Sequence, residues 1–201
     1  MPPKVRFSRE TIRDTAYDIV REQGAVGLTA RSLADRLGVS TSPIFTAFSN
    51  MDDVLASVRD LAVSELDQKI SLSVWMSQSF KGLGLSLLDF ARNERKLFSV
   101  IFTGDVSLSE KLSKTKIQAI RLIMADEGLS ETEADSVFSH FLVFVLGLCF
   151  IDPGGKTVHR EDMLDSEYRS LISCVKQHKS ANTAPSGYGA SHTTIGGEES
   201  G

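Results

Sequence analysis

The segment from Ser40 to Phe48, STSPIFTAF, carries the side chains with the clearest chemical use in this sequence. Ile44 and Phe48 are four residues apart, so in a helix they share one face, and this apolar face would point inward. The other face would then carry hydroxyl groups, which both donate and accept hydrogen bonds. A short helix with a small, polar outer face is what reading the major groove of DNA requires. The outward residues are Thr41, Ser42, Thr46 and Ala47.

A preceding helix and a tight turn must position this segment. Thr29 is a suitable N-cap, because its hydroxyl can accept a hydrogen bond from an unpaired backbone N–H. Gly38 follows the apolar positions of that helix, and a left-handed glycine ends a helix without a clash at Cβ. Ser40 would cap the second helix, and Pro43 lies in its first turn, where a missing N–H costs nothing. The pattern therefore predicts a helix-turn-helix from Thr29 to Phe48.

The remaining chain is predicted to be all-α. A helix from about Arg9 to Gln23, capped by Ser8, completes a three-helix helix-turn-helix head with the two helices above. Apolar residues then recur at helical spacing to about residue 179, which gives a larger helical body. The last stretch is rich in Ser, Gly and Thr and is predicted to be disordered. The predicted domains are residues 1–50, 51–179 and a tail at 180–201.

Charge and composition are those of an ordinary soluble protein, with 41% hydrophobic and 24% charged residues. Residues 1–50 carry seven Lys or Arg against five Asp or Glu, whereas residues 51–201 carry fifteen against twenty-one. A head of charge +2 on a body of charge −6 is compatible with DNA contact at one end, but does not indicate it alone. The cations Lys4, Arg6 and Arg9 are either solvated or form an arm that touches phosphates.

The sequence does not indicate a membrane protein, a secreted protein, a metal-binding protein or an enzyme. No apolar leader begins the chain, and the run from Phe141 to Ile151 is too short to span a bilayer, so we expect a buried core helix and a cytoplasmic protein. Cys149 and Cys174 lie in apolar helical contexts and are expected to be buried, reduced thiols. The histidines lack metal-ligand spacing, and phosphate loops and H-E-x-x-H are absent. We therefore expect no enzyme activity, no cofactor and no metal.

The run LTARSLADRLGVSTSPIFTAFSNMDDVL at residues 28–55 resembles the DNA-binding domain of the TetR family of bacterial transcriptional regulators. The resemblance is strongest over about residues 9–55, and two positions depart from it. Phe45 stands where the family usually has Tyr, and Met51 where it usually has Lys, so two phosphate contacts are lost and weaker DNA binding is expected. The matching residues are Leu28, Thr29, Leu33, Ala34, Gly38, Val39, Ser40, Ile44, Phe48 and Leu55.

The resemblance implies that the segment from Ser40 to Ala47 enters the major groove of double-stranded DNA, with Phe45 on the same helix. Hydroxyl groups there would bond base edges or phosphates, and Pro43 and Ala47 would touch thymine methyl groups. Thr29 and Arg31 would grip phosphate. The alternative for each polar residue is ordinary capping or solvation. The three hydroxyl-bearing candidates are Thr41, Ser42 and Thr46.

The resemblance also implies a homodimer, with two recognition helices about 34–36 Å apart on a palindromic operator. Its dimer interface would use Phe138, Phe141, Val145 and Cys149 on one helix and Leu164, Tyr168, Leu171 and Val175 on another. These residues could instead be monomer core.

The resemblance further implies that a small apolar or aromatic effector binds the body and releases the protein from DNA. The protein would then be a ligand-responsive repressor. The alternative function is a helical ligand- or protein-binding module whose DNA binding is weakened or lost. The expected effector wall consists of Trp75, Met76, Phe80, Phe98, Phe102, Met124 and His140, which could also be ordinary core residues.

Overall fold

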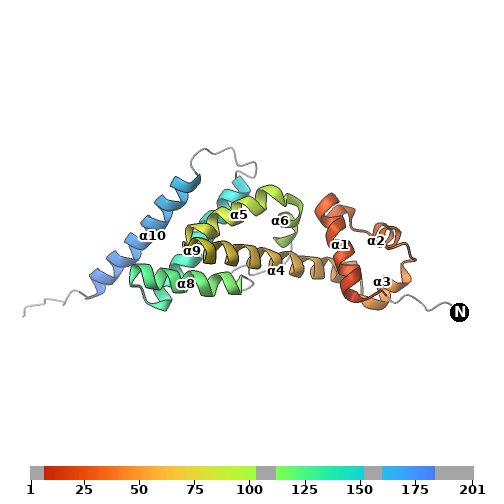
Figure 1. The fold of residues 1–201 in the computed structure, drawn as a ribbon, viewed down its shortest axis with the longest axis horizontal. Helices are drawn as coiled ribbons and strands as arrows, with labels where there is room; N and C mark the ends of the chain where they lie inside the picture. Colours follow the sequence, from red (N-terminus) through yellow and green to blue (C-terminus); the bar gives the residue numbers. More distant parts are fainter. Residues whose placement is uncertain (1–6, 103–111, 152–159, 184–201) are drawn as a thin grey trace, which may run out of the picture.

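The computed structural model describes residues 7–102, 112–151 and 160–183, and these ranges are helical without a strand. The all-α prediction is confirmed for them. The helices, labelled in Figure 1, are α1 (Arg9–Gln23), α2 (Ala30–Leu37), α3 (Ser42–Ala47), α4 (Met51–Ser77), α5 (Lys81–Asn93), α6 (Arg95–Ile101), α8 (Ser113–Glu127), α9 (Glu131–Ile151) and α10 (Arg160–Thr183). A single 3-10 turn, Ala25–Gly27, joins α1 to α2.

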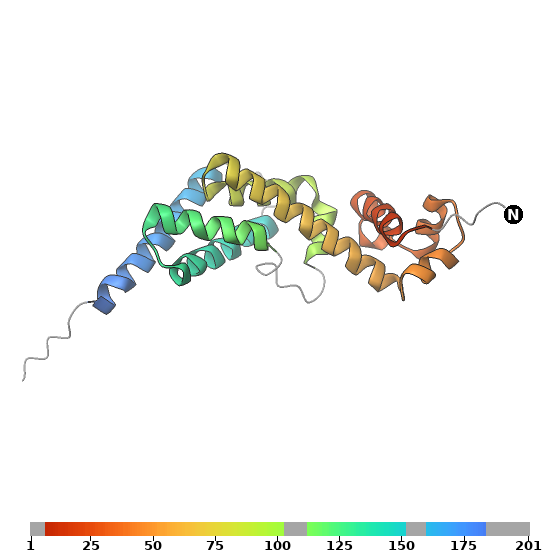
Figure 2. The same ribbon diagram turned by 60° about the horizontal axis from the view of Figure 1, so that its bottom comes forward.

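The molecule is elongated, with a small head at one end and a larger helical body (Figures 1 and 2). Helices α1, α2 and α3 form the head, and α4 runs from the head into the body. In the body α4 packs against α5 and α8, while α9 packs against α5, α8 and α10. Helix α10 lies at the end farthest from the head.

The long helix α4 is capped at its start and buried along one face. The side chain of Asn50 accepts a hydrogen bond of 2.8 Å from the backbone N–H of Asp53, and acidic residues occupy the first turn. Val58, Ala62 and Leu66 form part of the buried stripe. The helix continues to Ser77, and in its last turns Val74 is fully buried, whereas Trp75 and Met76 are exposed.

Helix α9 begins with a capping box. Ser130 Oγ accepts from the N–H of Glu133 at 3.4 Å, and Glu133 accepts from the N–H of Ser130 at 2.7 Å. By length and composition α9 is the one described helix that could cross a bilayer, yet it packs into the body. Helix α9 is a core helix as expected on one side only, since Val143, Phe150 and Ile151 are exposed.

Three further expectations differ from the structure. Helix α3 begins at Ser42 with Thr41 as a cap that makes no side-chain bond, so Ser40 is not its cap. Cys149 is buried as expected, but Cys174 is exposed because it lies on the outer side of α10. The tail is predicted to be disordered from residue 180, but α10 extends to Thr183. Residues 184–201, together with Lys4 and Arg6, lie outside the described residues.

Candidate nucleic-acid interface and body cavity

Local hydrogen bonds fix both ends of α2, its capping box at Thr29 and its C-cap at Gly38. Thr29 Oγ1 accepts from the N–H of Ser32 at 3.0 Å, and Ser32 Oγ accepts from the N–H of Thr29 at 3.0 Å. Gly38 ends α2 with φ 69°, in the left-handed region where glycine has no Cβ to clash. The N–H of Val39 then donates to the carbonyl of Ala34 at 3.0 Å. The left-handed Gly38 and the bond from Val39 to Ala34 set the angle at which α3 leaves α2.

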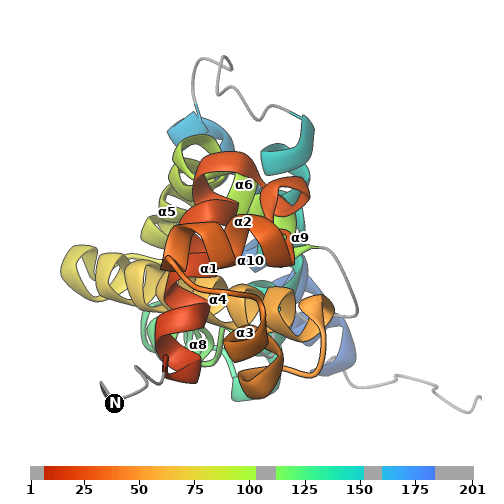
Figure 3. The ribbon, with the colours of Figure 1, turned by 90° about the vertical axis from the view of Figure 1, so that its right-hand side faces the viewer.

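Helix α3 presents the outer face that the sequence predicts. Ile44 is fully buried and Phe48 nearly so, while Phe45 is 48% exposed. Thr46 Oγ1 donates to the carbonyl of Ser42 at 2.9 Å, so this hydroxyl keeps only its acceptor capacity for another partner. In the end-on view of Figure 3, α2 and α3 lie in front of the body. The exposed set on and before α3 is Ser40, Thr41, Ser42, Phe45 and Thr46, with Pro43 and Ala47 partly exposed.

Arg9 ties α1 to the end of α3. Its Nη1 donates a hydrogen bond of 2.6 Å to the carbonyl oxygen of Ala47, and its guanidinium lies 3.9 Å from the ring centroid of Phe48. The cation thus satisfies a carbonyl at the helix C-terminus and stacks on an aromatic ring. The sequence suggested Arg9 as part of a phosphate-binding arm. Its internal role has no local signal, because Arg9 and Ala47 are 38 residues apart.

A second ion pair fixes α2 against α1. Both guanidinium nitrogens of Arg36 donate to the carboxylate of Glu22, each at 2.6 Å. These bonds lower the pKa of Glu22 and raise that of Arg36. By contrast, the Arg31 side chain is 91% exposed and approaches Asp35 only at 3.9 Å. Arg31 is therefore a cation on the head surface that is available to an outside anion.

Polar contacts also join the head to the body. The hydroxyl of Tyr17 on α1 donates to Glu65 of α4, and burial is the main cause of a raised pKa for this phenol. Arg21 forms an ion pair with Glu94, which precedes α6. Lys96 on α6 bonds the backbone carbonyl of Glu22. Helix α1 is thus attached to both α4 and α6.

The residues expected to form an effector wall do not meet in one place. Phe80 packs against Phe141 at a centroid distance of 4.7 Å, whereas Phe98 and Phe102 form a separate cluster with Phe150. A periodic apolar pattern shows which residues share a helix face but not which helices they meet, so the sequence could not separate these groups. Among the other four, Trp75 and Met76 are 63% and 71% exposed, and Met124 and His140 are also exposed.

A small cavity of about 180 Å³ lies where the α4–α5 turn, the end of α8, α9 and α10 meet. Its floor is apolar, formed by Phe80, Phe141 and Leu164, which are all at least 95% buried. Its rim is charged. The sequence predicts Phe80 as part of an effector wall, but it carries no signal for the rim, because the rim residues come from separate elements. The rim residues are Gln78, Ser79, Lys81, Asp126, Glu127, Asp165 and Tyr168.

Most of the residues predicted for a dimer interface are buried within the chain itself. Phe138, Phe141, Val145, Cys149 and Leu164 are each at most 2% exposed, which favours the alternative that they are monomer core. Tyr168, Leu171 and Val175 are half-buried and pack against the same core. The outer face of α9 carries apolar residues instead, with Val143 69%, Phe150 57% and Ile151 84% exposed.

Within the part of the chain that the structure describes, no three His, Cys, Asp or Glu residues are placed to hold a metal ion. His140 is occupied locally, since its Nδ1 lies 2.8 Å from the carbonyl oxygen of Ser136 on the same helix. The described part of the head therefore offers hydroxyl, methyl and aromatic groups and the exposed cation of Arg31 for recognition of a partner.

No protein-family model and no curated protein matches the sequence. Solved structures do match. A protein of unknown function from Rhodococcus sp. RHA1 is 18% identical, with a TM-score of 0.65 over 87% of this chain and 98% of that one. A TetR variant from Acinetobacter baumannii AYE, in complex with minocycline, is 20% identical, with a TM-score of 0.55 over 89% and 99%. A putative transcriptional regulator from Streptomyces coelicolor A3(2) is 16% identical, with a TM-score of 0.48 over 88% and 98%.

Proposed function

We propose that this chain, which has a TetR-like all-helical fold, is a ligand-responsive transcriptional regulator that binds double-stranded DNA as a homodimer. The observation that carries the proposal is the exposed, polar face of α3, held at a fixed angle by α2 and by Arg9. A face of this kind on a helix-turn-helix is suited to the major groove.

The side chains of that face indicate that few base edges are recognised directly. The exposed hydroxyl groups of Thr41 and Ser42 can bond base edges or phosphates, and Phe45 can make apolar contact with thymine methyl groups. No Arg, Asn or Gln lies on α3 for bidentate contact with a base. Shape readout and phosphate contacts, including one from Arg31, would then carry much of the specificity.

Phosphate binding is reduced at two positions. Phe45 has no hydroxyl, and Met51 has no charge where the TetR family usually has Lys. Met51 begins α4 and its side chain packs partly against the core, so the position is used for packing instead. We therefore propose DNA binding that is weaker than is usual for such regulators.

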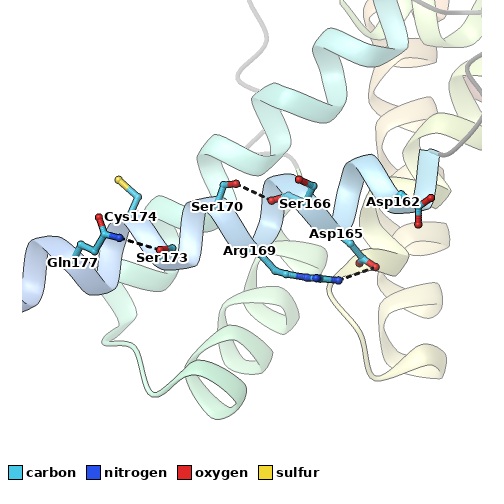
Figure 4. A pocket seen from close by; sticks show the side chains of 8 residues that line it. All are labelled: Asp162, Asp165, Ser166, Arg169, Ser170, Ser173, Cys174 and Gln177. Atoms are coloured by element: carbon cyan, nitrogen blue, oxygen red, sulfur yellow. Dashed lines mark hydrogen bonds and ion pairs between the residues drawn. The ribbon is translucent and has the colours of Figure 1, made fainter.

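The outer face of α9 supports the proposed homodimer. Val143, Gly147 and Ile151 follow at helical spacing on that face, and a Cβ added to Gly147 would meet nothing within 4 Å. On α10, Ser166, Ser170 and Ser173 are exposed short side chains that lie beside the charged Asp165 and Arg169 (Figure 4). Short side chains let another helix approach closely. Two copies would pair through α9 and α10, and so place two heads on a palindrome.

A small effector would act by binding two arrangements of the dimer with different affinity. We propose that a small apolar or aromatic molecule binds the body and releases DNA, which makes the protein a cytoplasmic repressor. The head is suited to transmit such a change, because α1 is joined to both α4 and α6. The structural neighbour from Acinetobacter baumannii holds minocycline, which is consistent with a ligand-binding body.

The experiment that tests DNA binding is capture of sheared genomic DNA on the purified full-length chain, at low and then moderate salt. Recovery of a few sites with a shared palindrome is the expected result. A variant with both Thr41→Ala and Ser42→Ala, which leaves the buried side of α3 intact, is expected to lose these sites. Random fragments, or none at moderate salt, would overturn the proposal.

The second candidate is a helical ligand- or protein-binding module without a DNA target. The observation that favours it is the pair of lost phosphate contacts at Phe45 and Met51. Complete absence of salt-dependent DNA affinity would establish it over the regulator.

A further inference from the structure

The body cavity described above has an apolar floor and a charged rim, which together define the chemistry of a ligand. The three rings of Phe80, Phe141 and Tyr168 enclose one side, with centroid distances of 4.7 Å for Phe80 to Phe141 and 5.3 Å for Phe80 to Tyr168. The carboxylates of Asp126 and Glu127 lie at the rim, at the end of α8. A ligand would therefore place its apolar part inside the cavity and a polar group at the rim.

The sign of the charge at the rim is negative. The lining contains three carboxylates and one ammonium group, that of Lys81. Lys81 Nζ is already paired with Asp165 Oδ2 at 2.7 Å, so it is not available to an anionic ligand. Glu127 is paired with Lys176 at 2.7 Å from outside the lining, and no ion pair joins Asp126 to a cation among the described residues. Asp165 also lies 3.8 Å from the guanidinium of Arg169, again from outside the lining, so Asp126 is the rim carboxylate without an ion pair among the described residues.

The nearby carboxylates also affect the protonation of Tyr168. Burial, followed by the charges of Glu127 and Asp126, raises the pKa of its phenol, so the hydroxyl stays protonated. A protonated phenol beside two carboxylates can accept a hydrogen bond from an ammonium N–H, and its ring can contact the cation. An anion in the same place would be repelled by both carboxylates.

The volume limits the size of the ligand. A cavity of about 180 Å³ holds about six water molecules at about 30 Å³ each. This is below the range of about 300–1,000 Å³ that drug-sized ligands occupy. One ring with a short chain fits, and a multi-ring molecule does not.

We propose that this cavity binds a small organic ammonium ion, with its apolar part on Phe80 and Phe141 and its cation between Asp126 and Glu127. The binding itself does not depend on DNA. Only its consequence, a change in DNA affinity, rests on the proposed function, and the two can fail separately.

The test is calorimetric titration of the full-length chain, without DNA, with 2-phenylethylammonium. Two probes of similar size, phenylacetate and 2-phenylethanol, serve as anionic and neutral controls. The ammonium ion is expected to bind more tightly than either. Equal binding of the three probes, or no binding of the ammonium ion, would overturn the proposal.

Variants then locate the site. Asp126→Asn and Glu127→Gln remove one rim charge each and are expected to weaken binding of 2-phenylethylammonium by about threefold or more. Asp89→Asn makes the same change at an exposed carboxylate of α5 outside the cavity and is expected to have no effect. Rim variants that bind like Asp89→Asn would place any binding elsewhere and contradict the assignment.

Discussion

The hydroxyl of Tyr17 in the head donates a hydrogen bond of 2.5 Å to Oε2 of Glu65 in the body. Burial and the neighbouring carboxylate of Glu65 raise the pKa of Tyr17 above its ordinary value of 10.0. The bond joins α1 to α4 at the point where a change in the body would reach the head. The bond therefore stabilises the molecule and helps to fix the orientation of the head relative to the body.

Tyr17→Phe is expected to lower the free energy of unfolding by about 0.5–1.5 kcal/mol at neutral pH, because the ring remains and one hydrogen bond is lost. The wild-type contribution is present below pH 10 and is lost as pH rises toward the raised pKa, since the unfolded chain releases this proton first. The alkaline loss of stability should thus be shallower in the variant. Urea unfolding at neutral and alkaline pH measures both effects, and equal slopes for the two proteins would contradict the assignment.

Arg31→Ala is expected to weaken binding to specific and random DNA alike. Its cation is almost fully exposed, and loss of one phosphate contact should lower the salt dependence of binding by about one unit in the logarithmic slope. Fluorescence anisotropy across a salt series measures this slope. Arg92→Ala, at an exposed position of α5 in the body, is the matched control and should change nothing. A loss confined to the operator would rule out a phosphate role for Arg31.

Met51→Lys is expected to raise DNA affinity and lower stability together. The new ammonium supplies a phosphate contact and steepens the salt slope by about one unit. The same charge at the N-terminus of α4 opposes the helix dipole, at a cost of about 0.3–1 kcal/mol, besides the lost packing of Met51. Anisotropy and thermal unfolding give the two readouts. Met76→Lys, at an exposed site on α4 far along the body, should leave affinity unchanged.

Val143→Glu is expected to convert the proposed homodimer into a monomer. The residue is 69% exposed in the single chain, so the substitution is tolerated by the fold, but pairing of two copies would bury an uncompensated charge. Sedimentation velocity without DNA measures the change. Val26→Glu, at a 91% exposed position in the head, should remain dimeric. If Val143→Glu sediments like the wild type, the dimer does not use this face.

Asp67→Ala is expected to lower the free energy of unfolding by about 1–3 kcal/mol, because it leaves buried N–H groups without a partner. The Asp67 carboxylate is 4% exposed and accepts from the backbone N–H of Thr115 at 2.9 Å and of Lys114 at 3.1 Å. It thereby caps α8 from a neighbouring helix. Chemical denaturation measures the loss, with Asp89→Ala as an exposed control. Equal stability of the two variants would show that the cap is replaceable.

The sequence by itself determined the local features of the head. The caps at Ser8 and Thr29 and the left-handed Gly38 are as predicted, because each depends on hydrogen bonds or backbone angles within a few residues. The outward hydroxyl groups of α3 follow from the same local periodicity. The fold class also followed, since only helical spacing recurs along the chain.

Only the tertiary structure decided which neighbouring helix, or solvent, each helix face contacts. Helix α9 is apolar on every side from Phe141 to Phe150, so periodicity could not tell that Phe141 lies in the core and Val143 outside it. The contact of Arg9 with Ala47 and the capping of α8 by Asp67 join residues 38 and 47 or more positions apart. The cavity takes its residues from several helices. Such relationships arise from packing of distant segments, for which the sequence carries no local periodicity or spacing signal.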